Sequence, residues 1–187
     1  MKPADTENVS TTTLEAFADT IIPGEKRSPE DRAVAGAAPG GGAVAAGAIE
    51  LLHNPATGIT EGLTGLADAL NDHARAYAAE HDLAGDDTVP PFVALPFADR
   101  VALVRALTAP GHPEKEFWVL LALFSNMAFD SAAHMHTVEA MAQGHPGLTA
   151  MGFSQPDADG LWRFPEYSYG RKLADLHPDT TPSGSPA

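Results

Sequence analysis

EKEFWVLLALFSNMAFDSAAHMHTVEAMAQ, which occupies residues 114–143, is a long and largely apolar stretch without glycine or proline. Pro113 suits the first turn of a helix, and Gly144 and Pro146 form a stop signal after it. Apolar residues recur at helical spacing along one side, and in the first half they occupy the other side too, which is typical of a buried helix. We therefore expect one long central helix over residues 114–143, with the rest of the chain packed around it.

The composition excludes several classes of function. The chain has 187 residues and a net charge of −14, with only 11 lysines and arginines, so it lacks the basic surface that nucleic acids and anionic membranes require. Without cysteine it has no disulfide, thiolate metal site or cysteine nucleophile. Polar residues interrupt the apolar stretch before it is long enough to span a membrane, so we expect no membrane insertion. No export signal or twin arginine precedes the first helix, which predicts a cytoplasmic protein.

The remaining chain shows further helical patterns and no convincing strand pattern. Thr12 and Glu15 fit a capping box at the start of a first helix, which ends at Pro23 and Gly24. Further helices are predicted over residues 43–53, 60–81 and 97–107. The predicted fold is therefore all-α, an irregular helical bundle around the long central helix.

From Gly144 onward, glycine, proline and aromatic residues predict an ordered C-terminal arm without helix. Its aromatic and arginine side chains are of the types that dominate protein interfaces: Trp162, Arg163, Phe164, Tyr167, Tyr169 and Arg171. We expect a partner interface here, with a ligand pocket or a cap folded over the core as alternatives. The predicted organisation is a mobile N-terminus over 1–10, a single helical domain over 11–176 and a disordered tail over 177–187.

Asp130 and His134 are the sharpest candidates for chemistry. On one helix they lie on adjacent turns, where the carboxylate can orient the imidazole as a general base or a metal ligand, or form only a structural polar pair. His134 and His136 point apart on a helix and cannot share an ion. His136 and Glu139 are better spaced for a metal, but two ligands are too few. Six other histidines are spread along the chain, and a site assembled from them in space stays open.

LEAFADTIIPG, residues 14–24, resembles the opening helix of the gluconate 2-dehydrogenase subunit 3 family. The likeness continues through residues 48–52 and returns in the apolar helix and in the glycine- and aromatic-rich residues 145–170. Members of that family are small, non-catalytic helical subunits that accompany a large flavin-containing dehydrogenase of the glucose-methanol-choline type. Several of them carry an export signal for both proteins, and this sequence departs from that pattern.

The resemblance implies that this chain is an accessory subunit of an oxidoreductase, which pairs with and stabilises a flavin-dependent partner. It implies that FAD is bound by the partner and that this chain binds no cofactor. The alternative is a small all-α enzyme that acts on a neutral or hydrophobic metabolite, with Asp130 and His134 as its acid–base pair. A deep apolar pocket that opens onto His134 would favour this alternative.

Overall fold

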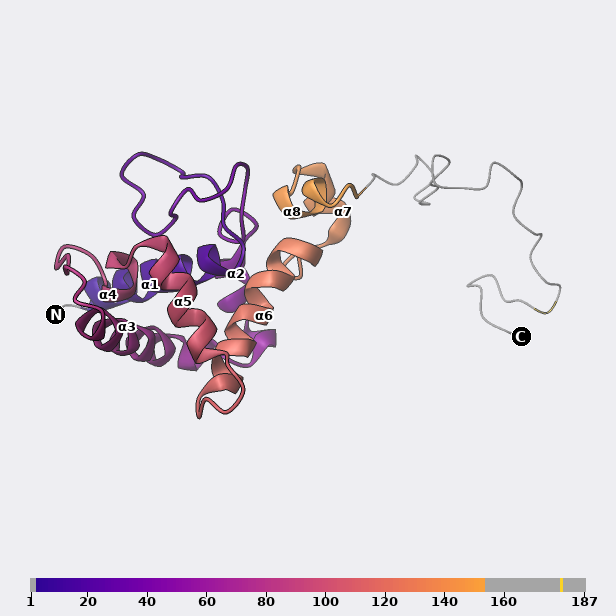
Figure 1. The fold of residues 1–187 in the computed structure, drawn as a ribbon. Coiled ribbons are helices and arrows are strands. Elements are labelled where there is room, and N and C mark those ends of the chain that lie inside the picture. Colours follow the sequence, from indigo (N-terminus) through magenta and orange to yellow (C-terminus); the bar gives the residue numbers. More distant parts are fainter. Residues whose placement is uncertain (1–2, 154–178, 180–187) are drawn as a thin grey trace. The chain divides into compact units, whose positions relative to one another are not determined.

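The computed structural model describes residues 3–153 and residue 179, and all regular structure within these residues is helical (Figure 1). This confirms the predicted all-α bundle. The helices are α1 (Pro3–Ile21), α2 (Ala48–Leu52), η1 (Pro55–Thr57), η2 (Thr60–Gly62), α3 (Leu63–Glu80), α4 (Pro91–Ala94), α5 (Phe97–Leu107), α6 (Lys115–Ser131), α7 (Thr137–Ala142) and α8 (Pro146–Ala150). They all lie in one compact unit, Met1–Phe153. The predicted single domain over residues 11–176 extends beyond Phe153, and this further part lies outside the described residues, as does the predicted tail apart from residue 179.

The helix at the centre of the bundle is α1. Most of its second half is buried, with no more than 1% exposure at Thr13, Leu14, Ala16, Phe17, Ala18 and Asp19. It packs against α2, α3, α4, α5 and α6. Its alanines allow the neighbouring helices to approach closely, because a small side chain leaves room for another backbone.

Instead of one helix over residues 114–143, the structure has α6 and α7, separated by a turn. Ala132 ends α6 in the left-handed conformation, at φ 49° and ψ 45°, and its N–H donates to the carbonyl of Met127. The hydroxyl of Ser131 donates to the same carbonyl over 2.8 Å. The single long helix was therefore wrong in extent, although both of its halves are helical.

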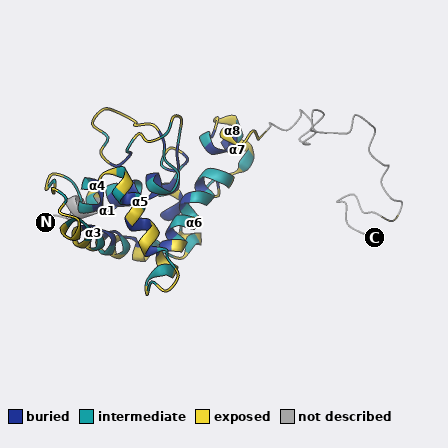
Figure 2. Ribbon diagram, viewed as in Figure 1, coloured by how far each residue is buried: buried dark blue, intermediate teal, exposed yellow. Residues whose placement is uncertain are grey.

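Burial of α6 on all sides was also wrong. One side of the helix is buried, through Trp118, Leu121, Ser125 and Ala128. On the opposite side Val119 is 42% and Leu123 49% exposed, and Phe117, near the start of the helix, is 58% exposed. The ribbon of α6 accordingly carries both buried and exposed residues (Figure 2). Within the described residues, no helix combines the length and apolar character needed to cross a membrane.

The start of α1 differs from the predicted capping box. The hydroxyls of Thr12 and Thr13 each donate over 2.8 Å to the carbonyl four residues earlier, as threonines inside a helix do. Glu15 is turned outward to an ion pair with Arg27 instead of reaching back to a cap. The helix already begins at Pro3, so residues predicted to be mobile belong to α1.

The segment between α1 and α2 has little regular structure, and buried charged side chains hold it. Asp19 accepts hydrogen bonds from the backbone N–H groups of Gly24, at 3.1 Å, and Ala35, at 2.9 Å. Arg100 of α5 is buried and donates to the carbonyls of Leu95, Ala33, Arg32 and Val93. Burial raises the pKa of Asp19 and lowers the pKa of Arg100, and the two opposite charges favour each other's ionised form.

Two predicted helices match their sequence patterns, and two short ones were missed. The patterns over 60–81 and 97–107 correspond to η2 with α3 and to α5. Of the pattern over 43–53 only α2 is helical, because Gly47 at φ 86° interrupts it. The helices α4 and α8 each begin with a proline in segments expected to be loop; proline fits the first turn, where its missing N–H costs no bond.

Candidate functional site

The predicted pair of Asp130 and His134 does not form. Asp130 lies near the end of α6, and its carboxylate accepts a 2.7 Å hydrogen bond from the side-chain amide of Asn126. His134 lies beyond the end of the helix, so the spacing of adjacent turns no longer applies. In the part of the chain that the structure describes, no hydrogen bond or ion pair joins the two side chains. The geometry therefore gives no support to an acid–base pair.

His134 instead packs against the turn before α2. Gly47 adopts φ 86°, and a Cβ atom added to it would lie 2.3 Å from His134 Nε2. The ring centroid of His134 lies 6.1 Å from that of His145. Burial lowers the pKa of His134, opposed by the nearby carboxylate of Glu50, and its Nδ1 is buried without a hydrogen-bond partner among the described residues. His134 thus fills the space that the glycine leaves.

An apolar hollow of about 390 Å³ lies close to this region. Ile22, Pro23, Pro39, Phe129 and Pro146 are among the residues that line it. Neither Asp130 nor His134 belongs to its lining, so this hollow does not supply the pocket that the enzyme alternative requires.

The weak metal candidates His136 and Glu139 stay apart from other ligands. His136 is exposed directly before α7, and Glu139 lies in the first turn of that helix. Among the described residues, the group of three possible metal ligands that lie close together lies elsewhere and includes neither of them.

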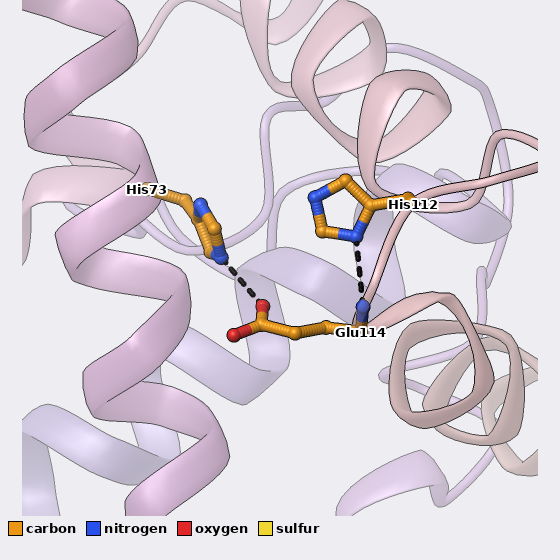
Figure 3. A group of neighbouring side chains, drawn as sticks. All are labelled: His73, His112 and Glu114. Atoms are coloured by element: carbon orange, nitrogen blue, oxygen red, sulfur yellow. Dashed lines mark hydrogen bonds and ion pairs between the residues drawn. The ribbon is translucent and has the colours of Figure 1, made fainter.

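That group consists of His73, His112 and Glu114 (Figure 3). His73 extends from α3, and its Nε2 lies 2.7 Å from Oε2 of Glu114, the residue before α6. The same carboxylate oxygen accepts a 3.3 Å hydrogen bond from the indole N–H of Trp118. The backbone N–H of Glu114 donates to Nδ1 of His112 over 3.2 Å. Two histidines and a carboxylate thus gather where α3 meets the start of α6.

The electrostatics of this group favour an ionised carboxylate. The hydrogen bond from His73 lowers the pKa of Glu114, and the indole of Trp118 adds to the effect, while partial burial opposes it. His73 and His112 are two of the six dispersed histidines that, from the sequence, could have joined a site assembled in space. His73 and Glu114 lie 41 residues apart, and no local motif links them. The only local signal is that His112 stands two residues before Glu114 at the start of an apolar helix.

A second candidate is the outer face of α6, which we define as Val119 and Leu123. At about 100° per residue, both residues lie opposite the buried side of the helix, whereas Phe117, although exposed, lies at the margin of the buried side. Large apolar side chains gathered on one exposed face are typical of binding surfaces. The arm residues predicted to form an interface, Trp162, Arg163, Phe164, Tyr167, Tyr169 and Arg171, lie outside the described residues.

The described residues therefore define a small all-α protein with two candidate sites, the histidine–carboxylate cluster and the exposed apolar face of α6. The chain belongs to a family of unknown function (DUF5987), which it matches over residues 8–187. Comparison with curated proteins and with solved structures gives no match.

Proposed function

We propose that this chain is a non-catalytic accessory subunit, which pairs with and stabilises a flavin-dependent oxidoreductase in the cytoplasm. The observation that carries the proposal is the outer face of α6. Its two side chains are 42% and 49% exposed, although the opposite side of the same helix is part of the core. A partner that covers this face would remove apolar surface from water, which is the main favourable term in protein association.

The choice of partner rests on the resemblance of residues 14–24. In the structure Leu14, Phe17 and Ala18 of this motif are in the core, and Asp19 binds the N–H of Gly24 at its end. A motif that builds the core is one that proteins of the same fold would share. The resemblance therefore favours the large flavin-containing subunit as the partner, with FAD bound there.

The strongly acidic character of the chain fits a subunit that has to persist before it meets its partner. A net charge of −14 keeps separate copies apart by repulsion, in spite of an exposed apolar face. A partner surface that carries positive charge around an apolar centre would be complementary to this subunit.

Co-expression with the proteins encoded by neighbouring genes tests the pairing, and a flavin oxidoreductase among them is the expected partner. We expect the two proteins to elute together in a fixed ratio, with the visible absorption of flavin, and we expect the flavoprotein to melt at a higher temperature in the complex. Leu123→Asp should abolish co-elution, because it places a charge in the covered apolar face. Val138→Asp is the matched control, since Val138 of α7 is 52% exposed and lies outside this face.

Two results would contradict the proposal. One is that the flavoprotein is equally stable and active without this chain and does not elute with it. The other is that Leu123→Asp and Val138→Asp associate as well as the natural sequence, which would remove the outer face of α6 from the interface.

The C-terminal arm supplies an independent prediction for the same complex. Trp162→Ala and Tyr167→Ala should each weaken assembly by about 2 kcal/mol, as interface anchors do. The melting temperature of the isolated chain should stay nearly unchanged. A large loss of stability with unchanged affinity in the folded fraction would assign both residues to the core of the subunit.

A further inference from the structure

The cluster of His73, His112 and Glu114 plays no part in the pairing proposed above. One nitrogen of each histidine and one carboxylate oxygen all lie within 4.8 Å of one another. The three side chains are half-buried, so they are held by their surroundings and still open to solvent on one side. Figure 3 shows His73 and His112 on either side of the Glu114 carboxylate.

The core of the protein fixes the position of this cluster. Trp118 is buried one turn after Glu114, and its indole N–H donates to the carboxylate. Its ring meets His73 edge-on at 5.8 Å between centroids and packs against Phe17 of α1 at 6.4 Å. The carboxylate and one imidazole are therefore oriented by the most buried aromatic residues of the bundle, which reduces the cost of ordering them around a ligand.

The donor set selects a class of ligand. Two imidazole nitrogens and one carboxylate oxygen suit Zn²⁺ and neighbouring first-row transition metals, whereas Mg²⁺ and Ca²⁺ prefer oxygen donors alone. The Glu114 oxygen that accepts from Trp118 also faces His73 at 2.7 Å, and an anionic carboxylate offsets part of the charge of a divalent cation. Partial exposure of the cluster gives the ion a route of entry.

We propose that His73, His112 and Glu114 bind one divalent transition-metal cation of the zinc type, with a fourth position open to water. Metal–ligand bonds of about 2.0–2.1 Å place tetrahedral ligand atoms about 3.3 Å apart. The His73 Nε2 and Glu114 Oε2 atoms, now 2.7 Å apart, have to separate slightly to admit the ion.

Binding must break two existing hydrogen bonds. His73 Nε2, which lies 2.7 Å from Glu114 Oε2, has to give up its hydrogen to bind the ion, so the bond between these two atoms is lost. The second bond is at His112. The Nδ1 atom of His112 accepts from the backbone N–H of Glu114 over 3.2 Å, so a neutral His112 carries its hydrogen on Nε2. A metal at Nδ1 displaces that N–H directly. A metal at Nε2 requires the ring hydrogen to be on Nδ1, where it would face the N–H of Glu114, so two donors would point at each other. In both cases the amide of Glu114 and the ring of His112 change their environment, which gives a readout of binding that is independent of any activity.

The test uses the full chain without an affinity tag, because a polyhistidine tag would itself bind the metal. Co²⁺ is titrated and followed by its visible absorption, and Zn²⁺ is then used to displace it. Nitrogen chemical shifts of the histidine rings and of the Glu114 amide are recorded with Zn²⁺. The variants are His73→Gln, His112→Gln and Glu114→Gln, and thermal unfolding shows that each is folded. His81→Gln is the matched control, because His81 ends the same helix and stacks on Tyr77 away from the cluster.

We expect one cation per chain, an affinity that falls on acidification, and shifts at His112 and the Glu114 amide. Each cluster variant should weaken binding by at least ~10-fold, while His81→Gln leaves it unchanged. His136→Gln should also bind normally, since His136 lies outside the cluster. Absence of saturable binding by the folded chain, or equal affinity in the natural sequence and any two folded cluster variants, would overturn the proposal.

Discussion

Replacing Phe17 by alanine tests whether α1 is the centre of the bundle. Phe17 is completely buried and packs against Trp118, with 6.4 Å between ring centroids. Burial of such a side chain contributes about 1.5–3 kcal/mol, and an aromatic pair adds about 0.5–1.5 kcal/mol. With the cavity left behind, we expect Phe17→Ala to lower the free energy of unfolding by about 3–5 kcal/mol. Since a domain has only about 5–15 kcal/mol in total, this is a large fraction of its stability.

Phe117→Ala is the matched control, because it makes the same substitution at an exposed position of α6. Phe117 is 58% exposed, so less than half of its side chain contributes burial. Alanine also has the higher helix propensity, by about 0.5 kcal/mol, which offsets part of the loss. We expect a net change within about 1 kcal/mol.

Equilibrium unfolding in urea, followed by circular dichroism, measures both variants. The midpoint should shift strongly for Phe17→Ala and little for Phe117→Ala, with the same dependence on urea concentration. A loss below about 1 kcal/mol for Phe17→Ala, or a larger loss for Phe117→Ala, would refute the central position of α1.

Three further predictions concern His134 and its surroundings. Gly47→Ala should destabilise the protein by at least ~2 kcal/mol, because the alanine would have a positive φ and would also clash with His134. Gly58→Ala is the control: Gly58 has a similar φ but open space around it, so thermal melting should show a smaller loss of stability. Because burial lowers the pKa of His134, the unfolded chain takes up the proton first as the pH falls through the usual value of 6.5. Unfolding measured from pH 7 to 5 should show stability falling below that value, and less so in His134→Gln. Asp130→Asn should leave the NMR titration of His134 unchanged, since Asp130 bonds to Asn126; a shifted titration would restore the pair.

The helical class could be predicted from the sequence because it depends on local patterns. The helices α3 and α5 have apolar residues at helical spacing and boundaries close to glycine or proline, and both were found. The break after α6 could not be predicted in this way. It depends on Ala132 in a left-handed conformation, which is a property of glycine or asparagine far more often than of alanine.

Which helix is the most buried could not be predicted from the amino-acid composition of the helices alone. The sequence of α6 is more apolar than that of α1, yet α1 is the one enclosed by other helices. Enclosure depends on which helices pack around a segment, and that is decided by contacts distant in sequence. The cluster of His73, His112 and Glu114 has the same origin, because α3 and the start of α6 are brought together only by the fold. A pattern of residue types at fixed spacing could therefore predict neither the enclosure of α1 nor the position of this cluster.

The four carbonyls held by Arg100 have a consequence for how the protein opens. Two of them, from Arg32 and Ala33, belong to the irregular segment between α1 and α2, which Asp19 also holds from the other side. If this segment detaches, the guanidinium loses two of its four carbonyl partners and the carboxylate loses its N–H partners, a more costly event than the fraying of an ordinary loop. The segment between α1 and α2 has little regular structure, but it should resist proteases as the core does. Its amide hydrogens should exchange with solvent at the same rate as those of α1.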